Sequence, residues 1–208
     1  MRKEFVYGLV AAVAIQAPTQ AQTPYQMDRT EEIRLAMSAG PLSVSEAADV
    51  YVFGAAGFEK AIEGSNGFSC LVIRQAGSPD VLAPHCLSPD ATQSVLPAKL
   101  EEGRLIAEGH DLEAVQSTLI SDFESGDLPL PSGQAYAYML SSGQRLGPAG
   151  NWRPHFMLYM PYATNETVGG VPGQPEFPFV GPEIGHPHST MVIVMSEFVD
   201  PADVQIRR

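Results

Sequence analysis

The chain has 208 residues, of which 44% are hydrophobic and 17% are charged, a composition typical of a globular domain and not of a disordered chain. This length provides one domain with a substantial core and leaves little room for a second domain. The formal net charge of -12 argues against nucleic acids and anionic membrane surfaces as partners, because both are bound through positive charge.

The N-terminus has the three regions of a secretory signal peptide. Residues 1–3 include two basic side chains, residues 5–15 form an apolar run, and small residues occupy the -3 and -1 positions of a cleavage site after Ala21. The apolar run is too short to span a bilayer, which favours cleavage over a retained anchor. We therefore predict a signal peptide over residues 1–21. The mature chain would begin at Gln22, carry no transmembrane anchor, and be periplasmic or secreted.

The two cysteines of the chain, Cys70 and Cys86, are predicted to form a disulfide. An even number of cysteines in an exported protein is typical of paired thiols. Each lies in a strand-like run, and the turn signal over residues 76–80 would bring the two runs together. A loop of this size stabilises a fold by about 3 kcal/mol in the chain-entropy model. A reactive or metal-bound pair is the alternative, although the spacing is not that of a C-x-x-C redox motif.

Three helices are predicted from caps, breakers and apolar periodicity. The first begins after Asp28, whose side chain can cap it, and ends before Gly40–Pro41. The middle of the chain predicts two more helices, over residues 97–108 and 111–125, separated by Gly109. We expect these two helices to form a helical hairpin that packs on one side of a sheet.

The remaining segments predict strands. Apolar and β-branched runs around the turn dipeptide Asn66–Gly67 predict an antiparallel meander over residues 49–86. Three further strands are expected over residues 135–140, 156–160 and 191–195. The predicted fold is a single α+β domain over residues 22–208, in which an antiparallel sheet carries the helical hairpin on one side.

Several short motifs are spread over residues 30–196. Residues 64–70 read Gly-Ser-Asn-Gly-Phe-Ser-Cys, a second cysteine follows, and residues 154–157 read Pro-His-Phe-Met. Together with Tyr138–Leu140 and Pro187–His188, they resemble a group of secreted bacterial domains of unassigned function. Those domains share a Gly-x-Asn-Gly-aromatic-x-Cys turn and a Pro-His-x-Met strand start. The resemblance implies an exported single domain and carries over no catalytic residues.

Histidines are the side chains that best suit a functional site, since the chain has no phosphate-binding loop, nucleophile elbow or zinc-protease motif. His155, His186 and His188 lie beside prolines at predicted strand starts, and Met157 and Met191 lie on the same strands. Imidazole and thioether ligands suit copper, so His155 and His188 are candidate ligands of a transition metal, with His186 as an auxiliary group. A metal-free histidine site and a plain packing role are the alternatives.

The pairing of the two strands decides whether His155 and His188 can share a metal. If the strands pair directly and antiparallel, the two histidines lie at opposite ends, roughly 20 Å apart, and the shared site is lost. A parallel crossover through the long connection over residues 162–188 would keep them together.

A pocket is predicted at an open surface near His155 and Trp152, with residues 162–188 as its roof. Connections of that length are usually functional or disordered. Trp152, the only tryptophan, either walls such a pocket or packs under the connection.

Two functions follow as hypotheses. The first is a non-catalytic binding or envelope-associated module, whose partner is a small molecule or an envelope component and which needs no cofactor. The acidic composition and the absence of catalytic motifs favour it. The second is a metal-binding protein or enzyme that uses His155 and His188, for which no catalytic residue can be assigned from the sequence.

Overall fold

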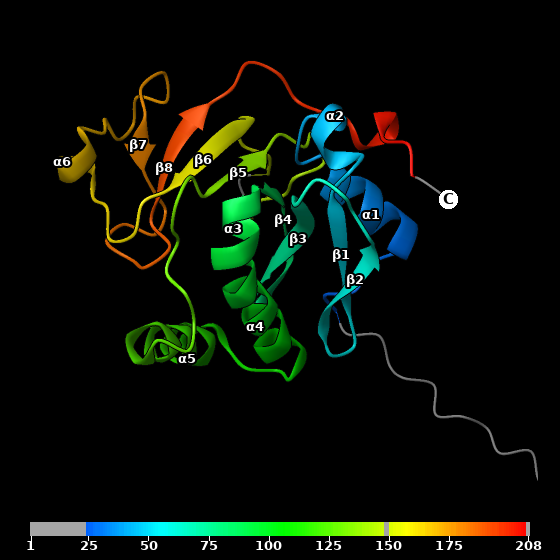
Figure 1. Cartoon of the computed structure of the whole chain (residues 1–208), viewed down its shortest axis with the longest axis horizontal. Coiled ribbons are helices and arrows are strands. Elements are labelled where there is room, and N and C mark those ends of the chain that lie inside the picture. The colour runs from blue at the N-terminus through cyan, green and yellow to red at the C-terminus, as the bar shows by residue number, and fades with distance from the viewer. Residues whose placement is uncertain (1–23, 148–149, 207–208) are drawn as a thin grey trace, which may run out of the picture.

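A computed structural model of the protein describes residues 24–147 and 150–206. Within these residues, eight strands form one mixed sheet in the order β2-β1-β3-β4-β5-β6-β8-β7, and six α-helices pack around it (Figure 1). The strands are β1 (Asp49–Gly54), β2 (Gly57–Ile62), β3 (Ser69–Gln75), β4 (Ser78–Leu87), β5 (Tyr136–Met139), β6 (His155–Tyr159), β7 (Phe179–Val180) and β8 (Thr190–Val194). The helices are α1 (Arg29–Met37), α2 (Leu42–Ser45), α3 (Pro89–Ser94), α4 (Leu96–Ala107), α5 (Leu112–Ser125) and α6 (Asn165–Val168). The predicted single α+β domain is confirmed.

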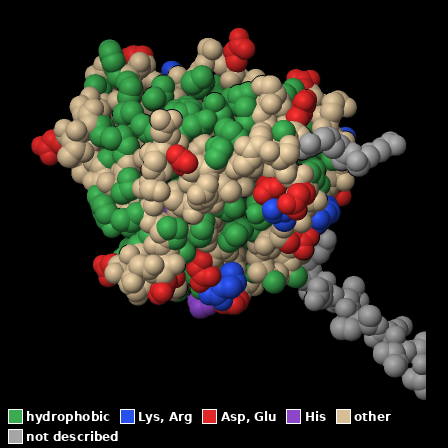
Figure 2. Space-filling view, in the orientation of Figure 1, with side chains coloured by type: hydrophobic (Ala, Val, Ile, Leu, Met, Phe, Trp, Pro, Cys, Tyr) green, Lys and Arg blue, Asp and Glu red, His purple; other side chains and the backbone are tan. Residues whose placement is uncertain are grey.

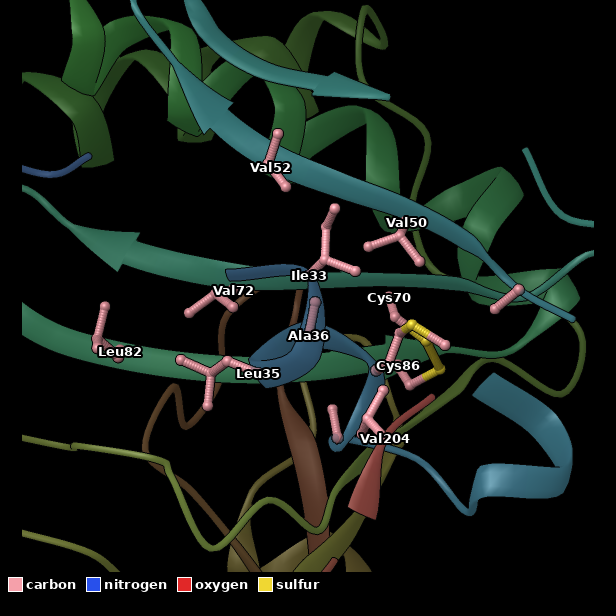
Figure 3. Packing of buried hydrophobic residues seen from close by; sticks show 13 residues of the cluster. Ile33, Leu35, Ala36, Val50, Val52, Cys70, Val72, Leu82, Cys86 and Val204 are labelled. Atoms are coloured by element: carbon pink, nitrogen blue, oxygen red, sulfur yellow. A yellow bond between two sulfur atoms is a disulfide. The ribbon is translucent and has the colours of Figure 1, made fainter. Parts of the chain in front are cut away.

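Helix α1 covers one face of the sheet. Asp28 caps it as predicted, because its carboxylate accepts hydrogen bonds from the backbone N–H groups of Thr30 and Glu31 at 2.9 and 3.0 Å. The buried side of α1, which includes Ile33 and Ala36, packs on β1, β3 and β4 (Figure 3). We call this face of the sheet, and its continuation across the later strands, the α1 side.

The predicted helical hairpin, formed by α4 and α5, lies on the other side. Helix α4 packs against β2 and β3, and α5 packs against α4. Asp111 caps α5 by accepting a hydrogen bond from the N–H of Ala114 at 2.9 Å, and Gly126 ends the helix with a left-handed backbone. The short helix α3, which the sequence did not predict, packs beside α4 on β4 and β5. We call this face the α4 side.

A buried ion pair joins α1 to the sheet. Glu32, on α1, accepts a hydrogen bond from Nη2 of Arg74 at 2.7 Å and one from the backbone N–H of Phe53 at 3.0 Å. Arg74 also donates to the carbonyls of Tyr25 and Val72, so its guanidinium is bonded on several sides. Both side chains are almost completely buried, so the loss of either one would leave the other as an unpaired buried charge.

The predicted antiparallel meander over residues 49–86 is wrong in one respect. Strands β1 and β2 form an antiparallel hairpin and β3 and β4 form another, but β3 pairs with β1 in parallel. The reason lies in the turn at Asn66, whose side chain donates to the carbonyl of Val44 and accepts from the N–H of Phe68. The bond to Val44 holds the turn against α2, which precedes β1, and the N–H of Asp49 donates to the carbonyl of Phe68. The chain therefore enters β3 beside β1 instead of folding back on β2.

The disulfide between Cys70 and Cys86 is present, as predicted. The two residues are directly opposite each other on β3 and β4, and they lie within the core cluster beneath α1 (Figure 3). Their place in this cluster indicates a structural bridge, since neither sulfur is exposed.

Strand β4 lies at the centre of the sheet, but its pairing with the strand on its outer side is incomplete. Cys86 and Leu87 pair with β5, and Leu82 forms an isolated bridge with Arg145 further along the chain. Pro84 lies between these two contacts, where a residue without an N–H group costs no hydrogen bond.

Candidate functional site

His155 and Trp152 lie together, but not on an open surface. His155 is only 4% exposed, and its ring packs edge-on against Trp152 with the centroids 4.9 Å apart. Burial lowers the pKa of His155, although a hydrogen bond from its Nδ1 to the carbonyl of Arg153 at 2.7 Å acts in the opposite direction. The predicted open pocket at His155 is therefore not formed. Phe179, from the long connection, does pack against Trp152, with centroids 5.9 Å apart.

The shared metal site at His155 and His188 is also not formed. Strands β6 and β8 pair antiparallel, with His155 opposite Val194 and Tyr159 opposite Thr190. His188 precedes Thr190 and therefore lies near the other end of β6, roughly 20 Å from His155 along the strand. His186 is exposed on the loop before β8. Among residues 24–147 and 150–206, no three His, Cys, Asp or Glu side chains gather in a way that could hold a metal ion.

His188 belongs to a different, aromatic environment. Its ring lies 4.7 Å from that of Phe123 on α5 and 5.8 Å from that of Tyr159 on β6. The side chain is 6% exposed, and its Nε2 is buried without a hydrogen-bond partner. Burial, with a smaller effect from the positive charge of Lys99, lowers the pKa of His188 to about 3, so the imidazole is neutral at physiological pH.

Lys99 on α4 is the centre of a half-buried group of titratable side chains on the α4 side. Its Nζ lies 3.0 Å from the carboxylate of Glu102. Burial lowers the pKa of Lys99, but the charges of Glu102 and Glu183 outweigh this effect and raise it above its usual value. Burial likewise raises the pKa of Tyr159. The pKa values of Lys99 and Tyr159 are therefore shifted further above pH 7. An acid–base catalyst instead needs a pKa near the working pH.

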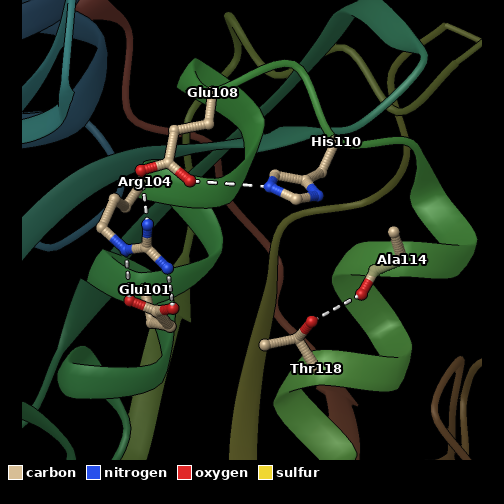
Figure 4. A network of polar contacts seen from close by, with 6 residues as sticks. All are labelled: Glu101, Arg104, Glu108, His110, Ala114 and Thr118. Carbon is tan, nitrogen blue, oxygen red and sulfur yellow. Dashed lines mark hydrogen bonds and ion pairs between the residues drawn. The ribbon is translucent and has the colours of Figure 1, made fainter.

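A hollow of about 490 Å³ lies between the β1–β2 turn and the helical hairpin. It is lined by Ala56, Phe58, Pro97, Leu100, Glu101, Arg104, Asp122, Asp127 and Leu128. Figure 4 shows Arg104 held between Glu101 and Glu108, with His110 facing Glu108. Because Arg104 is already bonded to two carboxylates, it is not free to bind an anion in this hollow.

The most distinctive surface is the continuation of the α1 side across β5, β6 and β8. Opposed residues on these strands share this face: Tyr136 with Leu158 and Met191, and Tyr138 with Phe156 and Ile193. All six are partly exposed, whereas the alternate residues of the same strands point to the α4 side and most of them are buried. We call these six residues the apolar sheet face. A sheet face exposed to water normally carries polar residues, whereas the only polar groups of the side chains at these six positions are the hydroxyls of Tyr136 and Tyr138.

Three rings of the apolar sheet face pack on one another. The centroids of Tyr136 and Phe156 are 4.9 Å apart, and Tyr138 lies edge-on to both at 5.6 and 5.5 Å. Figure 2, drawn in the orientation of Figure 1, shows the side of the molecule on which α3 and α4 lie in front of the sheet, and hydrophobic side chains are also gathered on that side. The helices that pack most extensively on the sheet are α1, α3, α4 and α6. They contact β1–β5 and β7.

Comparison of the chain with family models, with curated proteins and with solved structures found no match. The resemblance to the group of secreted bacterial domains therefore stays a prediction. Among the helices of the described residues, none is both long and apolar enough to cross a bilayer.

The apolar sheet face was not predicted from the sequence, although the chain carries a signal for it. The segments Tyr136–Met139, His155–Tyr159 and Thr190–Val194 lack the polar residue at every second position that a half-solvated strand usually shows. Such strands are expected to be covered on both faces. The group around Lys99 had no comparable signal, because Tyr159 and Glu183, unlike Glu102, come from distant parts of the chain.

Proposed function

We propose that the protein is exported and that its signal peptide is cleaved after Ala21. The N-terminal sequence supports this proposal, and so does the Cys70–Cys86 disulfide, because disulfides persist in oxidising compartments. The test is the mass of the protein isolated from producing cells. A mature chain that begins at Gln22 is expected outside the cytoplasm, and an intact chain from Met1 in the cytosol would contradict the proposal.

We further propose that the protein is a non-catalytic binding module that binds a partner on the apolar sheet face. The observation that supports this function is the set of six partly exposed apolar side chains on β5, β6 and β8. Exposed apolar surface of this kind is unfavourable in water unless a partner covers it. The shifts of the pKa values around Lys99, away from neutrality, favour binding over acid–base catalysis.

The chemistry of the face favours a protein partner over a sugar. A sugar ring stacks on a flat aromatic surface, but Tyr138 stands edge-on to Tyr136 and Phe156, so the three rings do not form a common plane. Tyr, Phe and Met are instead enriched where proteins contact one another. The chain's net charge of -12 opposes association with a second copy. We therefore propose an envelope or secreted protein with an apolar patch bordered by Lys and Arg.

Site-specific photo-crosslinking in producing cells tests this function. A photoreactive amino acid placed at Leu158 lies in the middle of the apolar sheet face, and the same amino acid placed at Glu113, exposed on α5, is the matched control. We expect a heterologous protein adduct at Leu158 that is absent at Glu113, and that is lost when Phe156→Ser and Ile193→Ser are added. Adducts identical at both positions, homodimers alone, or no adduct at Leu158 would refute the proposal.

A further inference from the structure

Two histidines and a methionine form a row across three neighbouring strands on the α4 side of the sheet. Met139 on β5 is directly opposite His155 on β6. On the other side of β5, Cys86 of β4 pairs with Tyr138, and His85 and Met139 are the next residues of the two strands on the α4 side. His85 and His155 are also close enough to interact electrostatically. Met139 therefore lies on the strand between the two histidines, and its side chain is within contact distance of His155, directly opposite.

Both imidazoles are held in the same way. Nδ1 of His85 lies 2.9 Å from the carbonyl oxygen of Ala83, and Nδ1 of His155 lies 2.7 Å from that of Arg153. A carbonyl oxygen only accepts, so Nδ1 carries the proton in each ring and Nε2 carries the lone pair. A hydrogen bond from the other ring nitrogen to a backbone carbonyl is the arrangement that orients histidine ligands of metals.

We propose that His85, Met139 and His155 form a binding site for a monovalent copper ion, with the two Nε2 atoms and the thioether sulfur as ligands. Nitrogen and thioether sulfur are the donors that this soft ion prefers. The site is independent of the apolar sheet face, which lies on the opposite side of the sheet.

The surroundings favour a monovalent ion over Zn²⁺ or another divalent ion. Among the described residues, no Asp, Glu or Cys lies together with two histidines in a group that could hold a metal ion. The donor set typical of zinc is therefore missing at this site. Two neutral imidazoles and a thioether, with no charged ligand among them, suit a soft monovalent ion better than a divalent one.

Copper(I) titration of the purified mature protein under anaerobic conditions tests the site, with a chromogenic copper(I) chelator as competitor. We expect one ion per chain, and an X-ray absorption spectrum that shows sulfur as well as nitrogen neighbours. Met139→Leu conserves the volume of a 3% exposed side chain, so the fold should be retained. Met37→Leu is the matched control, because Met37 is equally buried but lies in α1 on the opposite face.

The expected result is that Met139→Leu weakens copper(I) binding by more than about tenfold and removes the sulfur signal, while Met37→Leu changes neither. His85→Gln should also weaken binding, whereas His110→Gln, at an exposed histidine, should not. Binding that is equal in the Met139→Leu and Met37→Leu variants, a spectrum without sulfur in the unmodified protein, or no binding at all would overturn the proposal.

Discussion

Acidification from pH 7 to pH 5 is expected to destabilise the protein through its buried histidines. Burial lowers the pKa of both His85 and His188 to about 3. In the unfolded chain the same groups have a pKa near 6.5 and take up protons over this pH range. The unfolded state therefore binds more protons than the folded state, and the free energy of unfolding falls as the pH falls below about 6.5.

The size of the effect follows from linkage. Each of these two histidines remains neutral in the folded state down to pH 5, so it contributes a loss of about 2 kcal/mol between pH 7 and pH 5. Together, His85 and His188 predict a loss of about 4 kcal/mol, which is a large part of the 5–15 kcal/mol that a domain of this size usually has. The lowered pKa of His155 acts in the same direction and the raised pKa of Glu32 in the opposite one, whereas carboxylates with usual pKa values near 4 contribute little in this window.

Urea unfolding at a series of pH values measures this loss. His188→Phe replaces the buried ring with an apolar one, and it should remove about 2 kcal/mol of the pH dependence between pH 7 and pH 5. Gln116→Ala, at an exposed and non-titrating residue of α5, should leave the pH dependence unchanged. The reasoning fails if the free energy of unfolding is flat over this range, or if His188→Phe has the same pH dependence as the unmodified protein.

Three further predictions concern stability. Replacing Cys70 and Cys86 together by Ala should lower the free energy of unfolding by about 2–4 kcal/mol, and an unchanged denaturation midpoint would contradict a structural role. Glu32→Ala should cost about 3–5 kcal/mol because it leaves the Arg74 charge buried and unpaired, whereas the double variant Glu32→Leu/Arg74→Met should recover most of this loss in the same unfolding assay. Gly57→Ala should cost about 1–3 kcal/mol, since Gly57 has a φ of 99° and an added Cβ would lie 2.9 Å from the backbone nitrogen of Arg104; a melting temperature equal to that of the unmodified protein would contradict this account.

Local signals predicted the three longer helices, α1, α4 and α5, but not the short helices α2, α3 and α6, and they predicted strand neighbours less well. Asp28, Asp111 and Gly126 act at helix ends as their residue types indicate. The parallel pairing of β1 and β3 was missed because Asn66–Gly67 is typical of a tight hairpin. Its actual conformation depends on a hydrogen bond to Val44, far away in the sequence, and that contact is set by tertiary structure.

The candidate site shows the same limit. The proximity of His155 to Trp152 could be predicted, because only two residues separate them. Whether His155 meets His188 depended on the register of β6 and β8, which neither residue reveals by itself. Met139, which the structure places opposite His155, comes from a strand whose place in the sheet the sequence left open.

The interrupted pairing of β4 at Pro84 has a consequence for the order in which the chain assembles. Strands β1–β4 precede β5 in the sequence and lie together in the sheet, so they can pair while the C-terminal strands are still being synthesised. During that interval the outer edge of β4 is open to any other strand, including one from a neighbouring nascent chain. Pro84 removes an N–H group from the middle of this edge. Pro84 thus sacrifices no hydrogen bond in the complete sheet, and it protects the partly formed sheet from pairing with another molecule.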